Sequence, residues 1–258
     1  MGRGSAVITG ASSGIGEELA RLCAADGFDL ILIARRVEAL ERLADELRGK
    51  HRIDVRVLTA DLADSGAPGE IVRQIGAQPV DILINNAGFG VHGPFAQTDW
   101  QEERRLIEVN MIALTHLTKL LLPGMLARRS GRVLNVASTA AFVPGPLMAM
   151  YYASKAFVFS LSLALANEVE GSGVTVTVLC PGPTRTEFDQ VAKISGSRLF
   201  RGSAMSAADV AREGYDAMMA GKAEIIAGAR NRWMILGARL APRSLLAKAT
   251  RRLNSTAE

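Results

Sequence analysis

The sequence has little cysteine. Cys23 and Cys180 are the only two in 258 residues, and they lie far apart without any metal-ligand spacing. Small disulfide-stapled domains need several cysteines, so a disulfide framework is excluded. His, Cys and acidic residues also form no cluster with the spacing of a zinc site. The sequence therefore predicts neither a secreted disulfide scaffold nor a metal site.

A long uninterrupted apolar run is also missing. The richest stretch, "MIALTHLTKLLLPGMLA", is broken by His116, Lys119 and Pro123, whereas a spanning helix needs about 18 apolar residues. The N-terminus lacks the apolar segment and cleavage site of a secretory signal. Together with the scarce cysteine, these absences predict a cytoplasmic protein.

Acidic residues are scarce toward the C-terminus. The chain has a net charge of +4, but from Gly228 onward seven Lys or Arg accompany a single acid, Glu258, so the rest is slightly negative. This tail could cover the substrate cleft or a dimer interface, lie on an anionic membrane surface, or form a solvated basic helix. We favour the first interpretation. Nucleic-acid binding is not expected, because no recognition motif accompanies the charge.

Short apolar runs alternate with longer helical patterns. The runs are continuously apolar, which is typical of strands in a parallel sheet covered on both faces. Repeated βα units predict an α/β protein, a single doubly wound domain with about seven parallel strands and helices on both faces. We expect this domain over residues 1–227, with an irregular substrate loop at about 183–205. A basic helical extension, 228–258, is expected to pack on or near it.

Two helix starts can be predicted from capping residues. Thr98 and Gln101 have capping-box spacing at the start of a long helix that runs to about Arg128. Ser206 is expected to cap a helix that ends at Gly221.

A glycine-rich turn, "TGASSGIG", follows the first strand. Gly10, Gly14 and Gly16 permit a tight turn and a close approach of the backbone to a diphosphate, which the next helix would face with its N-terminus. The spacing is G-x-x-x-G-x-G, not the general G-x-G-x-x-G. A tight turn without a ligand is the alternative, but the position after the first strand favours dinucleotide binding.

Two arginines end the second strand. Where a site selective for NAD usually has an acid, this chain has Ala34, Arg35 and Arg36. Cations at a helix N-terminus are unfavourable, and a 2′-phosphate would remove that penalty by binding a guanidinium bidentately. The pair therefore favours NADP(H) over NAD(H).

Several short motifs follow one another along the chain. They are "TGASSGIG" at 9–16, Asp61, "NNAG" at 85–88, Asn110, Ser138, "YYASK" at 151–155 and "PGPTRT" at 181–186. Taken in order, these motifs resemble those of the short-chain dehydrogenase/reductase family, more narrowly a generic bacterial NADP-dependent branch. The resemblance implies a Rossmann fold and an oxidoreductase acting on CH–OH or C=O groups.

The resemblance also implies a cofactor site. Asp61 and Leu62 would contact the adenine, and the "NNAG" segment would line the adenosine side. Thr184 stands where the family often has an aliphatic residue, but the contact there is thought to use backbone. The implied cofactor-binding residues are Gly10, Ser12, Ser13, Gly14, Ile15, Gly16, Arg35, Arg36, Asp61, Leu62, Asn86, Ala87, Gly88, Tyr151, Lys155, Pro181, Gly182, Thr184 and Thr186.

Hydride addition to a carbonyl needs a proton donor beside the oxygen. A tyrosine with an ordinary pKa of about 10 is a weak acid at neutral pH, but a nearby ammonium such as Lys155 favours the phenolate and lowers that pKa. Ser138, at the end of the fifth strand, would orient the substrate oxygen. Asn110 is a poor helix former inside a helical pattern. The alternatives for it are a satisfied buried Asn or, as in the family, a helix kink that holds a water relay to Lys155.

Helical spacing does not separate the two tyrosines. Tyr151 faces Lys155 at i+4 and Tyr152 faces it at i+3. The family pattern Tyr-x-x-x-Lys, with a serine about a dozen residues upstream, selects Tyr151 as the acid/base. Tyr152 is then expected to pack or to form a pocket wall.

The expected substrate is a hydrophobic carbonyl or alcohol, because the residues flanking the site are apolar. The predicted substrate contacts are Ser138, Tyr151, Phe142 and Phe188, and further walls are expected from Val143, Pro144, Leu147, Met148, Val191, Leu199 and Phe200. We expect His92 to be exposed and not in contact with substrate, because a single loop histidine usually is. The resemblance implies a homodimer or homotetramer. A non-catalytic cofactor-binding sensor or scaffold, or an epimerase or dehydratase, remains an alternative to the ketoreductase.

Overall fold

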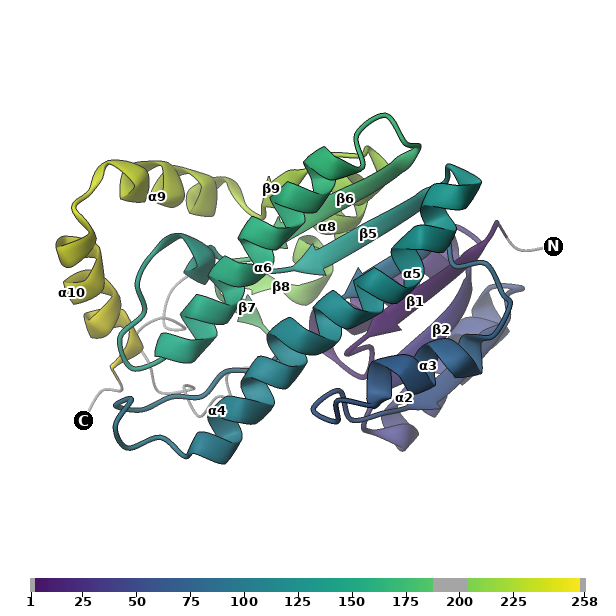
Figure 1. The fold of residues 1–258 in the computed structure, drawn as a ribbon, viewed down its shortest axis with the longest axis horizontal. Helices are drawn as coiled ribbons and strands as arrows, with labels where there is room; N and C mark the ends of the chain where they lie inside the picture. The colour runs from purple at the N-terminus through teal and green to yellow at the C-terminus, as the bar shows by residue number, and fades with distance from the viewer. Residues whose placement is uncertain (1–2, 188–203, 256–258) are drawn as a thin grey trace.

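The structure, a computed structural model, describes residues 3–187 and 204–255. Seven parallel strands form one sheet in the order β3-β2-β1-β4-β5-β6-β9 (Figure 1). The order reverses between β1 and β4, which makes the sheet doubly wound and confirms the predicted fold class. The strands are β1 (Ser5–Thr9), β2 (Asp29–Ala34), β3 (Val55–Thr59), β4 (Ile82–Asn85), β5 (Gly131–Val136), β6 (Val174–Cys180) and β9 (Glu224–Ile226).

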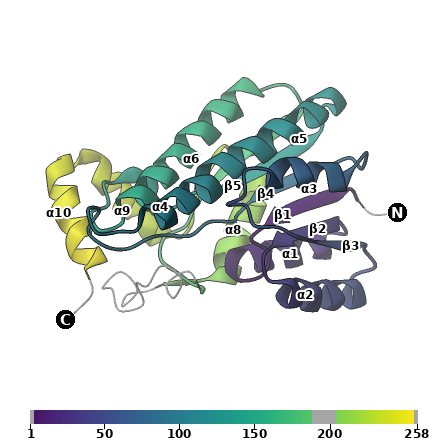
Figure 2. The same cartoon turned by 60° about the horizontal axis from the view of Figure 1, so that its bottom comes forward.

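Helices cover both faces of the sheet, as the turned view in Figure 2 shows. One layer holds α1 (Gly14–Ala25), α2 (Val37–Lys50) and α8 (Ala207–Met219). The other holds α3 (Ala67–Ile75), α4 (Trp100–Ile107), α5 (Leu114–Arg128) and α6 (Ala149–Glu168). A short parallel pair, β7 (Thr184–Arg185) and β8 (Met205–Ser206), lies outside the main sheet.

Successive residues of a strand supply two cores. On β1, Ala6 and Ile8 pack with the layer that contains α1, whereas Val7 packs with the layer that contains α3 and α5. Alternate side chains of a strand point to opposite faces. Because both faces are covered, both sets must be apolar, which explains the continuous apolar runs.

The long helix differs from its prediction at the start and in the middle. The residue that caps it is Asp99, whose carboxylate accepts from Gln101 N at 3.0 Å, while the Thr98 hydroxyl donates to Phe95 O. Asp99 lies one residue closer to the helix than Thr98, so its carboxylate reaches a free N–H of the first turn. Between α4 and α5 the chain forms a π-helix, η1 (Glu108–Ala113). The predicted cap of α8 is confirmed, since the Ser206 hydroxyl accepts from Asp209 N at 3.0 Å.

A buried polar chain ties α5 and α6 to the sheet. Asn85 and Asn135 are partners in register on β4 and β5, and Asn85 Nδ2 lies 2.9 Å from Asn135 Oδ1. Asn85 also donates to the Thr118 hydroxyl on α5, and Asn135 donates to the Ser162 hydroxyl on α6. Buried amides need such partners. These hydrogen bonds therefore hold α6 in place beside the end of β5.

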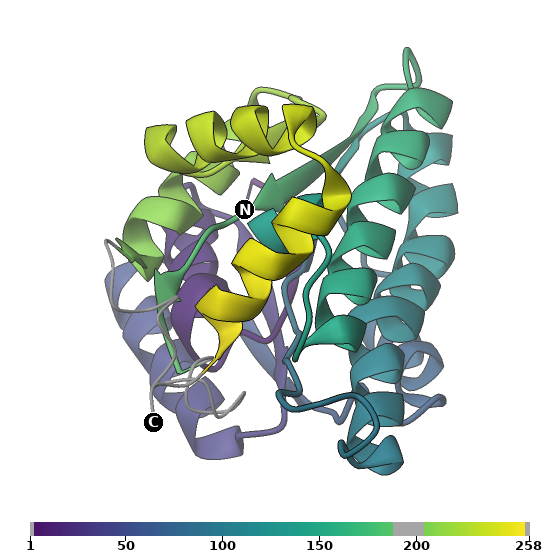
Figure 3. The ribbon, with the colours of Figure 1, turned by 90° about the vertical axis from the view of Figure 1, so that its left-hand side faces the viewer.

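The basic tail forms two helices, α9 (Ala229–Leu240) and α10 (Arg243–Asn254). Figure 3 shows both on the side of the molecule that faces the carboxyl ends of the strands. The end of α10 is buried, with Thr250 and Asn254 only 6% and 1% exposed.

Candidate active site

A cleft of about 410 Å³ opens along the carboxyl ends of the strands. Its walls come from the segments that follow β1, β2, β3, β4, β5 and β6, together with the first turns of α6. Open α/β sheets bind ligands at this edge, where the strand order reverses. The segments that the sequence motifs singled out therefore meet in one place.

The glycine turn forms one end of the cleft. Gly10 and Gly14 have φ values of 66° and 62°, in the region that favours glycine. A Cβ on Gly10 would lie 2.7 Å from Asn86 Nδ2, and one on Gly16 would collide with the Gly10 carbonyl oxygen. Asn86 Nδ2 donates to the carbonyls of Thr9 and Gly10. Asn86 thus fixes the turn, and Gly16 lets α1 pack closely against it.

The N-terminus of α1 is suited to an anion. Ser13 occupies the cap position, but its side chain accepts no hydrogen bond from the helix, and Ser12, Ser13, Gly14 and Ile15 line the cleft. The N–H groups of the first turn carry the positive end of the helix dipole. Bare glycine backbone and an uncapped helix start fit the diphosphate of a dinucleotide.

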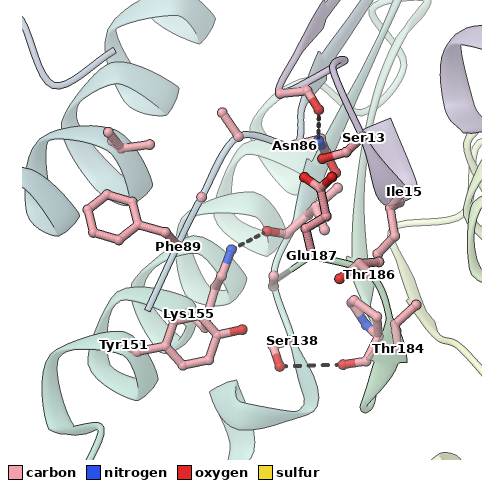
Figure 4. Close-up of a pocket in the computed structure, with 18 of the residues that line it drawn as sticks. Ser13, Ile15, Asn86, Phe89, Ser138, Tyr151, Lys155, Thr184, Thr186 and Glu187 are labelled. Atoms are coloured by element: carbon pink, nitrogen blue, oxygen red, sulfur yellow. Dashed lines mark hydrogen bonds between the residues drawn. The ribbon is translucent and has the colours of Figure 1, made fainter. Parts of the chain in front are cut away.

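Arg36 already has partners inside the cleft. Its guanidinium lies 2.8 Å from the Glu187 carboxylate and donates to the Ser12 hydroxyl and carbonyl. Arg35 is exposed and lines the cleft, with no hydrogen bond or ion pair to the described residues. Glu187, which motif analysis missed, projects toward Ser13 and Asn86 (Figure 4). A phosphate binding to Arg36 would compete with this carboxylate.

Asp61 forms an ion pair across the cleft. Its carboxylate accepts from Ala63 N at 3.0 Å and lies 2.7 Å from the Arg105 guanidinium on α4. Partial burial alone would raise the pKa of Asp61, but the Ala63 N–H and Arg105 outweigh it and lower the pKa. Arg105 is a second cleft residue that the motifs did not identify.

Tyr151, Ser138 and Lys155 converge at the other end of the cleft (Figure 4). Lys155 Nζ donates to the Val136 carbonyl at 2.8 Å and lies 5.9 Å from the centre of the Tyr151 ring. The Ser138 hydroxyl lies 3.4 Å from the Pro181 carbonyl and accepts from Ala140 N. A proton donor, a hydroxyl and an ammonium thus share one wall.

The electrostatics of this end differ from the expectation that Lys155 lowers the pKa of Tyr151. Burial raises the pKa of Tyr151, and a hydrogen bond with Ser138 only partly opposes the rise. Burial also lowers the pKa of Lys155 to about 8. Both charged forms lose hydration in the same pocket, and this loss is the largest influence on the pKa of each group. Without cofactor, burial therefore favours the neutral form of Tyr151.

Asn110 lies in the π-helix and does not itself line the cleft. Its side chain accepts from Phe89 N at 3.1 Å and donates to Phe89 O and to the Ser154 hydroxyl. A Cβ on Gly88 would lie 3.1 Å from Asn110 Oδ1 and 3.3 Å from Lys155 Nζ. Asn110 therefore joins the loop after β4 to α6 directly behind Lys155. Asn110 is therefore a buried Asn with its hydrogen bonds satisfied, and it lies in a π-helical turn, a place where helices commonly kink.

The neighbour of Tyr151 points elsewhere. The Tyr152 hydroxyl donates to Asn254 Oδ1 at 3.1 Å, and Asn254 Nδ2 donates to the Pro146 carbonyl at 2.9 Å. His92 Nε2 lies 2.8 Å from the Asn254 carbonyl oxygen. We call these four residues the α10 latch. No motif indicates Asn254, because its partners, His92 and the segment that holds Pro146 and Tyr152, lie more than 100 residues before it.

The predicted substrate residues are placed differently from one another. Met148, Tyr151 and Tyr152 line the cleft, whereas Phe142 packs edge-on against Phe159 at 4.7 Å and is not among the lining residues. Phe188, Val191, Leu199 and Phe200 lie outside the described residues. Of the cofactor residues, all but Gly16 line the cleft.

A cleft with this glycine turn and these three side chains defines a Rossmann-fold oxidoreductase. The chain belongs to the short-chain dehydrogenase family, whose family model matches residues 5–194. Proteins of this family that match the chain are named as reductases or dehydrogenases, and solved complexes with NADPH and with NAD are among them.

Relatives of known name are reductases and dehydrogenases. Very-long-chain 3-oxoacyl-CoA reductase of Phaeosphaeria nodorum is 38% identical over 196 residues, 74% of this chain and 58% of that protein. Dehydrogenase/reductase SDR family member 7B of Mus musculus is 36% identical over 85% of this chain and 72% of its own. Sulfoacetaldehyde reductase of Chromohalobacter salexigens is 38% identical over 80% and 84%. The chain thus spans little more than half of the very-long-chain reductase.

Solved structures share the fold over nearly the whole chain. A short-chain dehydrogenase from Sphingobium yanoikuyae in complex with NADPH has a TM-score of 0.83 and 34% identity, covering 92% of this chain and 93% of that one. A short-chain dehydrogenase/reductase from Burkholderia phymatum in complex with NAD has a TM-score of 0.82 and 25% identity, covering 99% and 98%. Both nicotinamide cofactors therefore occur on this fold.

The predicted cytoplasmic location is wrong. It is contradicted by the similarity to very-long-chain 3-oxoacyl-CoA reductase and to SDR family member 7B, together with two apolar helices. Within the described residues, Trp100–Arg128 and Ala149–Glu168 are long and apolar enough to cross a membrane by length and composition alone. The first contains the run judged too interrupted, because hydropathy averaged over a window tolerates single polar residues. Both helices also pack in the core of the domain.

Proposed function

We propose that the protein is an NADP(H)-dependent ketoreductase that interconverts a hydrophobic carbonyl and its alcohol. The observation that carries this proposal is the placement of Tyr151, Ser138 and Lys155 at one end of a cleft whose other end holds Arg35 and Arg36. A cofactor-binding sensor or scaffold would have no use for a buried acid/base pair beside the nicotinamide end.

The proposed roles follow from the contacts. The Ser138 hydroxyl orients the substrate oxygen, and Tyr151 gives that oxygen a proton during reduction and removes it during oxidation. When bound, the cofactor supplies or accepts the hydride. Lys155 returns a proton to Tyr151 after reduction, and Asn110 holds the loop and helix on which that relay depends.

The apolar side of the cleft supports a hydrophobic substrate. Phe89, Val109, Met148 and the Tyr152 ring line it near Tyr151. Two of the relatives are named for very different substrates, a very-long-chain 3-oxoacyl-CoA and sulfoacetaldehyde. A panel should therefore include ketones of increasing apolar size, a 3-oxoacyl thioester and sulfoacetaldehyde.

We also propose a homodimer or homotetramer through the long central helices. Ile112, Leu120 and Leu126 on η1 and α5 are exposed apolar residues that support such an assembly.

Cofactor preference is tested by thermal shift with NADPH and NADH. We expect NADPH to stabilise the protein more, and Arg36→Ala to remove most of the difference. Glu187→Gln should strengthen NADPH binding a few-fold and leave NADH unchanged, because it removes the carboxylate that competes for Arg36. Greater stabilisation by NADH would contradict the preference. NADPH binding without turnover of any carbonyl in the panel would favour the sensor or scaffold.

A further inference from the structure

The outward face of α9 is apolar. Trp233, Leu236 and Leu240 are 73%, 50% and 87% exposed, and their i, i+3, i+7 spacing places them on one side of the helix. Ile235, on the opposite side, is 2% exposed. A helix on a globular domain normally turns its polar side to water. Here an apolar face remains uncovered by the described part of the chain, although α9 already has a buried face.

The two helices that follow Gly228 are also rich in basic residues. The segment 229–255 contains no acid. On α10, Lys248, Arg251 and Arg252 are exposed, while Thr250 and Asn254 face the domain. The cations of the two helices are Arg230, Arg232, Arg239, Arg243, Lys248, Arg251 and Arg252.

We propose that the outer surface of α9 and α10 docks on an anionic lipid surface. An interfacial helix combines an apolar face that enters the headgroup region with cations that attract acidic lipids, and tryptophan favours that interface. Each Lys or Arg close to such a surface strengthens binding about fivefold. The apolar residues of α9 and the cations of both helices would therefore bind the same lipid surface.

Charge argues against a second copy of the chain as the occupant. A two-fold contact would bring the same basic patch against itself, and like charges facing each other disfavour association. The apolar residues on η1 and α5 offer a separate face for assembly.

The position of the patch links the lipid surface to the cleft. Asn254, at the end of α10, bonds to Tyr152, which lines the cleft. Figure 3 shows α9 and α10 running across this side of the molecule. Docking would therefore place the α10 latch close to the lipid.

Vesicle co-sedimentation of the full chain tests the proposal without reference to activity. We expect binding to phosphatidylcholine vesicles that contain phosphatidylglycerol, weaker binding as salt is raised, and little binding to pure phosphatidylcholine. The double variant Trp233→Ser, Leu240→Ser and the double variant Lys248→Glu, Arg252→Glu should each reduce binding at least tenfold.

The matched control reverses two exposed cations on α2, Arg42→Glu and Lys50→Glu, which changes net charge equally at a distant site. It should keep more of the binding than the α10 double variant. Circular dichroism and NADPH thermal shift check that each variant is folded. The proposal is overturned if the wild type stays in the supernatant with anionic vesicles at low salt, or if the α10 and α2 variants bind equally. It is also overturned if light scattering shows that the α9 variant breaks an oligomer while vesicle binding is absent.

Discussion

Tyr151 and Tyr152 are adjacent at the start of α6, yet the two sides of that turn meet different parts of the molecule. Tyr151 faces Ser138 and Lys155 in the cleft, whereas Tyr152 reaches Asn254 on the last helix. Their rings are 5.9 Å apart and inclined at 79°. Successive helical side chains point about 100° apart, so neighbours in sequence can serve different purposes. Tyr151 therefore has the proposed catalytic role, whereas Tyr152 connects α6 to α10.

The largest effect is expected from a substitution of Tyr151. Tyr151→Phe should lower kcat by about 10²–10⁴-fold, because general acid catalysis contributes that much, while NADPH binding is kept. Tyr152→Phe is the matched control, since it removes the same atom one residue away. Steady-state kinetics on the best substrate of the panel measures both. Full activity of Tyr151→Phe, or an equal loss in both variants, would contradict the assignment of Tyr151 as the acid/base.

Lys155 offers a test by pH. Burial lowers its pKa to about 8 from an ordinary 10.5, so between these values the unfolded chain binds a proton that the folded chain does not. The free energy of unfolding should therefore rise from about pH 8 to about pH 10.5, where the contribution levels off. Other buried groups titrate in this range, so the wild-type curve is compared with that of Lys155→Met.

Denaturant unfolding of the cofactor-free protein at several pH values gives both curves. We expect the wild type to gain stability relative to Lys155→Met as pH rises. Parallel curves would mean that Lys155 keeps an ordinary pKa, and would weaken its proposed place in the relay.

A smaller effect is expected from breaking the contact between Tyr152 and Asn254. Asn254→Ala removes the partners of the Tyr152 hydroxyl and the Pro146 carbonyl, and an unsatisfied buried group costs about 1–3 kcal/mol. Because the α10 latch is at the substrate end of the cleft, KM should rise more than kcat falls. Denaturant unfolding and kinetics measure the two effects, and Arg251→Ala, an exposed neighbour, is the control. Unchanged stability and KM would show that the latch is dispensable.

Much of the cofactor side could be predicted from the sequence. The glycine turn, Asp61, the "NNAG" segment and the "PG" turn are local, and each follows a strand of the same parallel sheet. Strand ends in such a sheet meet at one edge, so local order is enough to bring them together. At Asn110, a polar residue in a helical run, the sequence left a satisfied buried side chain and a helix kink as alternatives, and the structure has a buried, hydrogen-bonded Asn110 in a π-helix.

The substrate side could not be predicted in the same way. Phe142 is apolar and close to Ser138 in sequence, but it packs on Phe159 and Arg239 lies 5.9 Å from its ring. Glu187 and Arg105 are ordinary charged residues whose partners, Arg36 and Asp61, are far away in sequence. Such contacts depend on how loops and helices are packed, and carry no motif.

The sequence by itself determined the doubly wound sheet, the glycine turn and the family, because the alternation of apolar runs with helical patterns and the short motifs are properties of residues close together in the chain. The tertiary structure alone decided that Tyr152 bonds to Asn254, that Glu187 forms an ion pair with Arg36, and that burial raises the pKa of Tyr151. Desolvation and long-range hydrogen bonds arise only when distant segments close around the same atoms.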